Sequence, residues 1–337
     1  MDISNPVLVE VTRGNSVESR HRGAAVVIDG DGSLMAQWGD VGRPVYPRSA
    51  IKSIQALALV ESGAVERFEL GAQELALACA SHSGEPCHAE AVGGWLKRIG
   101  LGSEDLQCAT QVPRDDASAR AMVRAGDDPT ALHHNCSGKH AGLLTTALHM
   151  DEPVAGYLDP GHPVQRRVAR ILTEMGGTDL TDAVPGVDGC GIPTFAMPLS
   201  AIGLALARLA SPEGLAPKRA AAARCLFAAM TSHPYLVAGR GRFDTVAMKA
   251  GGGAFAVKTG AEGMYVAAVP GRRLGIALKI DDGAKRAAEV AMAALLQHLG
   301  VLDDATRAAL APYLDAPVLN AAGLRVGTIG TAAGWPG

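Results

Sequence analysis

The residues with the clearest chemical potential form an S-x-x-K motif, Ser49-Ala50-Ile51-Lys52, at the start of an expected helix. Residues at positions i and i+3 share a helix face, so the Ser49 hydroxyl and the Lys52 amine can meet. The partial positive charge at a helix start, together with burial, lowers the pKa of a lysine. A neutral Lys52 could then take the proton of Ser49 and make it a nucleophile. Alone, the motif is common, and a serine at a helix start is more often only an N-cap.

Two further motifs stand where serine–lysine acyltransferases carry the rest of their site. Lys258-Thr259-Gly260 ends an expected strand, and a K-T-G strand borders the site of such enzymes opposite the S-x-x-K helix. The turn Ser81-His82-Ser83-Gly84 follows an apolar helix and occupies the middle place in the sequence. A solvated lysine or a plain polar turn would explain each motif by itself. Three motifs in the required order favour an acyl-transfer site.

A third cluster contains residue types that bind transition metals. Cys136, Lys139 and His140 share one segment, and Asp188 and Cys190 share a glycine-flanked loop. Thiolate, imidazole and carboxylate together suit zinc. The segment has no C-x-x-C, and free cysteines are commonly buried as small hydrophobes, so spacing alone gives zinc weak support. The polar, glycine-rich character of both loops favours a site over plain core.

The elements that must position these motifs are strands at both ends of the chain and helices between them. Apolar runs in the first 40 residues flank Gly30-Asp31-Gly32, which is typical of a hairpin turn. A helix is expected from near Ser49 to Gly63. Further helices are expected at 72–79, 87–99, 117–124, 139–149, 163–175, 199–210, 217–230 and about 283–299, and strands at 253–258, 264–269 and 274–279. This order predicts an α+β fold in which one antiparallel sheet is closed by both ends of the chain and flanked by helices.

Composition excludes several classes of protein. The 337 residues are 48% apolar and 19% charged with a net charge of −3, which is ordinary for a globular protein. There is no basic stripe for nucleic acid. There is also no signal-peptide pattern, and the most apolar stretch, 202–210, is interrupted by Arg208, so no membrane association is expected. Six cysteines without a secretory signal indicate reduced thiols and a cytoplasmic location.

We expect a single domain over residues 1–337. Its sheet is expected from about 5–40 and 250–300, and its helical region from about 49–235. The loop at 239–244 is polar and glycine-rich, which suits either a lid or a contact between subunits.

Taken together, the motifs resemble the rhizobial-type L-asparaginases, and the resemblance covers nearly the whole chain. It is carried by the opening 5–14 and by Arg48-Ser49-x-x-Lys52, Ala80-Ser81-His82-Ser83-Gly84-Glu85, Asn135-Cys136-Ser137-Gly138-Lys139-His140, Asp188-Gly189-Cys190-Gly191 and Lys258-Thr259-Gly260-Ala261-Glu262-Gly263. The resemblance implies a fold similar to serine β-lactamases and penicillin-binding proteins. It also implies a homodimer and a bound Zn²⁺.

The resemblance also implies roles for individual residues. Ser49 with Lys52, and Ser81 with Lys258, would form two serine–lysine pairs. The zinc ligands would be Cys136, Lys139 and Cys190, and the substrate contacts would come from Arg48, Asp188 and His140. Since lysine must be neutral to coordinate, metal binding should weaken at lower pH. We expect the zinc to order the pocket and tune affinity rather than to activate water.

The expected reaction is hydrolysis of L-asparagine to L-aspartate and ammonia through an acyl-enzyme. A serine-type glutaminase is an alternative, because one methylene is discriminated by only about 1–3 kcal/mol. Another S-x-x-K acyl hydrolase, such as a β-lactamase, is a further alternative. The least favoured is a non-catalytic protein that binds zinc or an amino acid.

Overall fold

A computed structural model describes residues 5–337, and the chain within it divides into two units. Unit 1 comprises the chain up to Ala50 together with Met197–Ser211 and Val246–Gly337. Unit 2 comprises Ile51–Ala196 and Pro212–Thr245. One division falls inside the S-x-x-K motif, after Ala50. This division does not test the expectation of a single domain, which stays a prediction.

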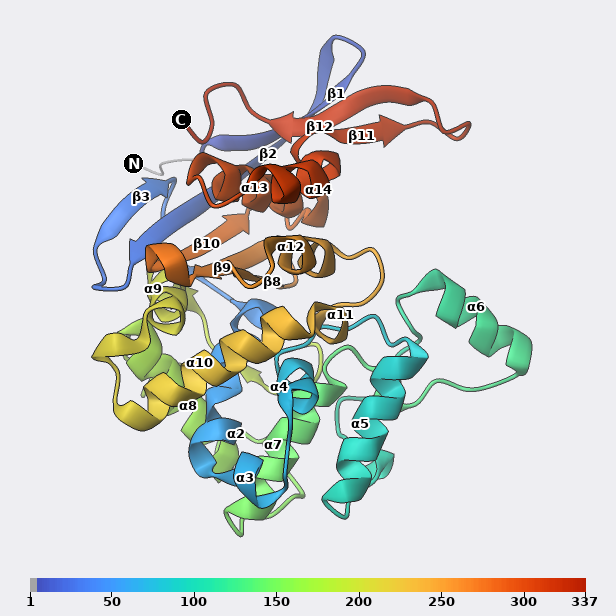
Figure 1. Cartoon of the computed structure of the whole chain (residues 1–337), viewed down its shortest axis with the longest axis vertical. Coiled ribbons are helices and arrows are strands. Elements are labelled where there is room, and N and C mark those ends of the chain that lie inside the picture. Colours follow the sequence, from blue (N-terminus) through green and yellow to red (C-terminus); the bar gives the residue numbers. More distant parts are fainter. Residues whose placement is uncertain (1–4) are drawn as a thin grey trace. The chain divides into compact units, whose positions relative to one another are not determined.

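Unit 1 is built on an eight-stranded antiparallel sheet with the order β11-β12-β1-β2-β10-β9-β8, and β3 pairs with β2 beside this path. Strands from the start of the chain therefore lie between strands from its end, as the blue and red arrows show (Figure 1). The strands are β1 (Val7–Arg13), β2 (Ser16–Asp29), β3 (Leu34–Trp38), β8 (Ala256–Thr259), β9 (Met264–Val269), β10 (Leu274–Ile280), β11 (Ala316–Leu319) and β12 (Arg325–Thr331).

Both faces of the central strands are covered. Successive residues of β9, and Ala24–Ile28 of β2, are all buried, so side chains on both sides of the sheet are shielded from water. The helix α9 (Leu199–Ala210) packs on β2, β9 and β10, and α13 (Lys285–His298) packs on β1, β9, β10 and β12. The approach of α9 is close enough to require glycine, because a side-chain carbon on Gly275 would lie 2.2 Å from the Gly203 carbonyl oxygen.

The rest of unit 1 is made of short elements. They are β4 (Pro44–Val45), paired with β7 (Met197–Pro198), α14 (Asp304–Leu314) and the 3-10 turn η1 (Arg48–Ile51), whose last residue belongs to unit 2. The helix α12 (Phe243–Gly251) crosses the division into unit 2.

Unit 2 is helical, with one short hairpin, β5 (Gly186–Val187) and β6 (Pro193–Thr194). Its α-helices are α1 (Lys52–Gln55), α2 (Leu57–Ser62), α3 (Ala64–Arg67), α4 (Ala72–Ala78), α5 (Pro86–Arg98), α6 (Asp116–Ala125), α7 (Ser137–His149), α8 (Pro163–Gly176), α10 (Pro217–Ser232) and α11 (Pro234–Val237). The helix α7 is central: it is buried from Ser137 to Ala147 and contacts α2, α4, α5 and α8. Gly138 allows this, since a side-chain carbon there would lie 2.3 Å from the Leu77 carbonyl oxygen.

The predicted α+β fold, with an antiparallel sheet flanked by helices, is confirmed. One expected helix is divided: the segment from Ser49 to Gly63 forms η1, α1 and α2, and it ends at Gly63 with φ of 95°. The sequence did not predict β11, β12 or the first half of β2. Every helix within residues 5–337 is too short or too polar to span a bilayer.

Candidate active site

The centre of the candidate site in unit 2 is the amine of Lys52, the first residue of α1. The side chain is fully buried. Its Nζ contacts the carbonyl oxygen of Ala80 at short range, the Ser81 Oγ at 3.1 Å and the Asn135 carbonyl oxygen at 3.5 Å. Burial lowers the pKa of Lys52 and outweighs the attraction of the neighbouring Cys136 sulfur. The amine is therefore biased towards its neutral form.

All three neighbours of the Lys52 amine can accept a hydrogen bond. The carbonyls of Ala80 and Asn135 can only accept, so Nζ donates to both. Nζ also donates to the Ser81 hydroxyl, which can in turn donate to a neutral amine. Lys52 and Ser81 can therefore exchange a proton, as a general base and a hydroxyl do.

The other predicted serine, Ser49, lies in η1 of unit 1 beside a strained residue. Arg48 has φ of 50°, in the left-handed region that residues with a side chain rarely adopt. Such strain concentrates at functional sites. The K-T-G motif lies against this turn, because a side-chain carbon on Gly260 would come within 2.8 Å of the Pro47 carbonyl oxygen and 3.2 Å of the Ala50 Cβ. Unit 1 thus brings η1 and the end of β8 together.

Lys258 belongs to the same part of unit 1. Its side chain is buried, and its Nζ donates to the Thr259 carbonyl oxygen at 2.8 Å. Ser49 and Lys258 are in unit 1, whereas Lys52 and Ser81 are in unit 2. Each of the two serine–lysine pairs expected from the resemblance therefore has one member in each unit, and both pairs stay predictions.

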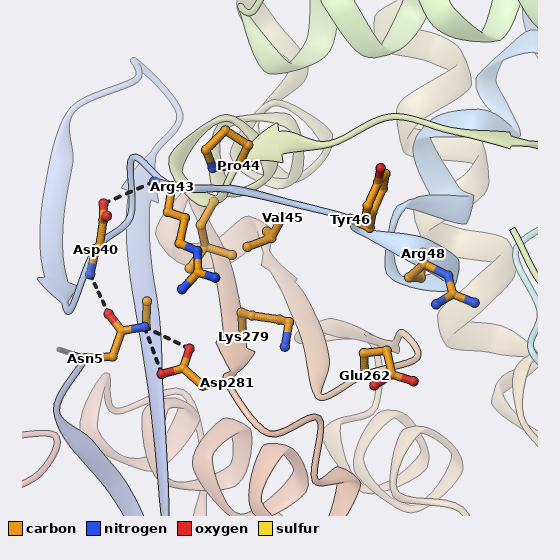
Figure 2. A pocket seen from close by; sticks show the side chains of 12 residues that line it. Asn5, Asp40, Arg43, Pro44, Val45, Tyr46, Arg48, Glu262, Lys279 and Asp281 are labelled. Atoms are coloured by element: carbon orange, nitrogen blue, oxygen red, sulfur yellow. Dashed lines mark hydrogen bonds between the residues drawn. The ribbon is translucent and has the colours of Figure 1, made fainter. Parts of the chain in front are cut away.

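Arg48 also lines a cavity of about 300 Å³ in unit 1 (Figure 2). The charged side chains around it include Arg43, Lys279 and Glu262, and at one end Asn5 Nδ2 donates to both oxygens of Asp281, at 2.9 and 3.1 Å. The volume is at the lower limit for ligand pockets, which suits a molecule of amino-acid size.

The predicted zinc residues meet in unit 2, where α7 begins. Lys139 Nζ donates to Cys190 Sγ at 2.9 Å, and Cys190 Sγ lies 3.5 Å from Asp188 Oδ2. The amine of Lys139 is 4.0 Å from the same carboxylate oxygen. Cys136 is also buried and is hydrogen-bonded to Cys190. The structure thus joins residues up to 54 positions apart in the sequence, from Cys136 to Cys190, into one cluster.

The two cysteines of the cluster share one negative charge. The hydrogen bond from Cys190 lowers the pKa of Cys136 and outweighs burial, and the nearby amines of Lys139 and Lys52 lower that pKa further. The same hydrogen bond, with burial, raises the pKa of Cys190. Burial lowers the pKa of Lys139, but the charges of Cys136, Cys190 and Asp188 outweigh burial and raise that pKa above its ordinary value. Without metal, the cluster is a buried thiolate–ammonium pair.

The donor set fits zinc if Lys139 takes part. Within residues 5–337, no three His, Cys, Asp or Glu side chains form a group that could hold a metal ion by themselves. Two soft sulfurs and one amine nitrogen, with the Asp188 carboxylate beside them, supply a four-donor set of the type that zinc accepts. Binding would require Lys139 and both thiols to lose their protons.

His140 is adjacent in sequence to this cluster and is completely buried. Its Nδ1 lies 2.7 Å from the Tyr157 hydroxyl, which accepts from the Gln107 backbone N–H at 2.9 Å. The hydroxyl can donate to Nδ1, and in that tautomer the imidazole proton is on Nε2. That Nε2 has no hydrogen-bond partner among the described residues. Burial holds the pKa of His140 well below its usual range, so the ring is a neutral donor with an open position for a ligand.

Sequence reasoning missed Tyr157, which orients His140, as well as the contact between Lys52 and Ser81. Tyr157 is 17 residues from His140, and Ser81 is 29 residues from Lys52. No periodicity in the sequence indicates either contact. Tyr157 is one of only five tyrosines in the chain, and its burial is visible in the structure alone.

The model of the L-asparaginase II family matches residues 9–331. A match over nearly the whole chain shows the family to which the chain belongs. The chain belongs to the L-asparaginase II family. This confirms the recognition made from the motifs.

Solved structures with a similar arrangement of helices and strands are known. The native form of a protein called Mglu is 13% identical, with a TM-score of 0.46 over 84% of this chain and 66% of its own, slightly less than two thirds of its length. A β-lactamase from Mycobacterium bovis is 14% identical, with a TM-score of 0.40 over 86% and 94% of the two chains. A D-alanine carboxypeptidase from Burkholderia cenocepacia is 16% identical, with a TM-score of 0.41 over 83% and 93%. Likenesses this distant do not extend to substrate or mechanism. A search of curated proteins found no match.

Proposed function

We propose that the protein hydrolyses L-asparagine to L-aspartate and ammonia through a serine acyl-enzyme. The observation that carries this proposal is the fully buried Lys52 amine, whose pKa is lowered by burial and which hydrogen-bonds the Ser81 hydroxyl at 3.1 Å. A lysine of this kind has no packing advantage over an apolar residue, but it can act as a base at neutral pH. Membership of the L-asparaginase II family supports asparagine as the substrate.

In the first half-reaction, Ser49 Oγ attacks the carbon of the side-chain amide, and its proton moves to Lys52 Nζ. Ser49 is three residues before Lys52, in the turn that leads into α1. As the C–N bond breaks, the departing nitrogen takes a proton that Lys52 passes through Ser81, and it leaves as ammonia. Positioned proton transfer of this kind contributes about 10²–10⁴-fold to a rate.

In the second half-reaction, water attacks the β-aspartyl ester on Ser49 and gives up a proton to Lys52. The ester C–O bond breaks, Ser49 recovers its proton from Lys52, and aspartate is released. Backbone N–H groups of η1 are suited to stabilise the oxyanion, a contribution of about 3–4 kcal/mol for each good donor.

The charged ends of the substrate need partners of opposite charge. We assign the α-carboxylate to Arg48 and the α-ammonium to Asp188, with the Nε2–H of His140 as a third polar contact. Zinc held by Cys136, Lys139 and Cys190 would order the loop that contains Asp188. We place its role in affinity rather than in turnover.

The test is ammonia release from L-asparagine, L-glutamine and a chromogenic β-lactam by the wild type and by Ser49→Ala, Ser81→Ala and Ser62→Ala. Ser62 lies at the end of α2, where its hydroxyl donates to the Leu59 carbonyl and accepts the Ala64 N–H, so it is a control away from the site. We expect turnover of asparagine alone, lost by at least about 10³-fold in Ser49→Ala and retained in Ser62→Ala. Peptide mass spectrometry of quenched wild type should place the acyl group on Ser49.

Other results would redirect the proposal. An acyl group on Ser81 would exchange the roles of the two serines. Faster turnover of glutamine or of the β-lactam would favour the alternative hydrolases. No turnover of any of the three substrates, with or without zinc, would refute the proposed function.

A further inference from the structure

The loop that contains Ser81 depends on a distant segment for its position. Residues 80–85 lie between α4 and α5 and belong to neither helix. The Ser81 N–H donates to the Val237 carbonyl oxygen at 2.9 Å, and the Ser83 hydroxyl donates to the Ala238 carbonyl oxygen at 2.9 Å. Both serines are buried. The segment 235–240, which we call the strap, therefore holds the main chain of the Ser81 loop.

One buried carboxylate fixes both ends of the strap. Glu85 is only 2% exposed. One of its oxygens accepts the Arg240 backbone N–H at 2.9 Å, and the other accepts the Tyr235 hydroxyl in a short hydrogen bond. The Arg240 guanidinium lies 3.6 Å from the same carboxylate. A carboxylate withdrawn from water is costly unless donors surround it, and here the donors come from the strap.

The fit between the strap and the Ser81 loop is too close for any residue but glycine at position 239. A side-chain carbon there would lie 2.5 Å from a Glu85 carboxylate oxygen and 2.8 Å from the Ser83 hydroxyl. Gly239 also has φ of 108°, which favours glycine.

Two histidines add a second connection. The His88 Nδ1 accepts the Glu85 backbone N–H at 3.2 Å, so its Nε2–H donates to the Tyr235 carbonyl oxygen at 3.0 Å. The His88 ring is stacked between His82, at 4.7 Å and 6°, and the Tyr235 ring, at 5.8 Å and 3°. His82 is the residue directly after Ser81. The stack thus connects the Ser81 loop to the start of the strap through a neutral imidazole.

We propose that Glu85 and Tyr235 are positioning residues, which act through the strap to hold Ser81 in line with Lys52. The proposal rests on the proposed function, because it takes Ser81 to be part of the proton relay. Neither residue contacts the Ser81 hydroxyl itself. A shift of about 1 Å in a catalytic group is enough to reduce a rate about 100-fold. The strap accepts hydrogen bonds from Ser81 and Ser83, and the Arg114 and Asp115 N–H groups donate to the Ser83 carbonyl oxygen from another segment.

The test compares Tyr235→Phe and Glu85→Gln with the control Glu152→Gln. Tyr235→Phe keeps the ring stack and removes only the hydroxyl. Glu152 is also a shielded carboxylate of unit 2, but it is held by Arg167 and not by the strap. Two quantities are measured for each variant: kcat and KM for L-asparagine per folded molecule, and hydrogen exchange of the peptides that cover the Ser81 loop.

For both strap variants we expect kcat to fall by at least about 10-fold while KM changes by less than about twofold. We expect the backbone amides of 81–84 to exchange about 10-fold faster, with exchange in α7 unchanged. Glu152→Gln should lose stability without either change. A purely structural role for Glu85 and Tyr235 would lower the amount of folded enzyme and leave kcat per folded molecule intact.

Three outcomes would overturn the proposal: unchanged exchange at 81–84, unchanged kcat in both strap variants, or an equal loss of kcat in Glu152→Gln. If the wild type does not hydrolyse asparagine, the proposed function fails separately. Hydrogen exchange still decides whether the strap holds the loop, because it requires no activity.

Discussion

Replacing Lys52 by Met tests the central claim that a buried, neutral amine serves as the base. Methionine has a similar length and no charge, so it fills the space without accepting a proton. General-base catalysis contributes about 10²–10⁴-fold, which is about 3–5 kcal/mol of barrier. We expect kcat for L-asparagine to fall by that factor. The Ala80 carbonyl and the Ser81 hydroxyl lose their partner, a cost of about 1–3 kcal/mol for each group that stays buried and unpaired.

The same variant makes a thermodynamic prediction that does not depend on activity. The pKa of Lys52 is lowered in the folded protein by burial, whereas it is about 10.4 in the unfolded chain. At a pH between the pKa of Lys52 in the folded protein and its pKa in the unfolded chain, the unfolded state binds more protons than the folded state. The stability of the wild type must therefore rise with pH in this range. The rise approaches about 1.4 kcal/mol per pH unit for one proton and ends above about pH 10.4. In Lys52→Met this contribution is absent.

The assay is urea denaturation of wild type and Lys52→Met from about pH 6 to pH 10, once with zinc and once with a chelator. The difference between the two unfolding free energies should grow with pH. Lys97→Met is the control, because Lys97 is an exposed residue of α5. The difference between its unfolding free energy and that of wild type should not change with pH. A pH-independent difference for Lys52→Met would refute the claim that the amine is held neutral, and near-wild-type kcat would refute its role as base.

Three further predictions concern the neighbouring parts of the site. Gly260→Ala places a carbon 2.8 Å from the Pro47 carbonyl oxygen, and we expect it to cost about 1–3 kcal/mol of stability by overpacking and to lower kcat; an unchanged urea midpoint would contradict the packing. Tyr157→Phe removes the hydroxyl that contacts His140 Nδ1. We expect steady-state kinetics to show that KM for asparagine rises about 10-fold with little change in kcat. An unchanged KM would count against a role of His140 in substrate binding. Chelation should raise KM and leave kcat unchanged, and loss of kcat alone would return zinc to a Lewis-acid role. Zinc affinity, measured by competition, should fall by at least about 10-fold for each unit by which the pH is lowered, because Lys139 must lose a proton to coordinate.

The sequence predicted most helices well because their signals are local. For example, α8 begins at Pro163 after the N-cap His162, whose side chain accepts the Val164 N–H, and its buried residues recur at helical spacing. The central strands were found because each is an apolar run. By contrast, β12 is half-exposed and rich in glycine and threonine, and it pairs with β11 on one side and with β1, from the other end of the chain, on the other. No local pattern indicates such a partner.

The candidate site shows the same limit. Residue type and spacing pointed to Lys139 and Cys190, whose side chains are hydrogen-bonded in the structure, and their role as zinc ligands stays a prediction. They did not reveal that Lys52 contacts Ser81, nor that Glu85 is a buried carboxylate bonded to Tyr235, 150 positions away. These contacts depend on how the helices of unit 2 pack, and sequence patterns describe one helix at a time.

The pairing of β1 with β12 has a consequence for how the protein must be made. The Thr328 N–H donates to the Thr12 hydroxyl across a separation of 316 residues. The first strands to leave the ribosome therefore wait for late partners, β2 for β10 and β1 for β12, until most of the chain has been synthesised. Native contacts this distant in sequence slow folding, because loop-closure entropy is lost before they form. An exposed hairpin edge is also a template for pairing with another chain. Recombinant yield should therefore depend on slow synthesis and on chaperones that shield the β1–β2 hairpin during translation.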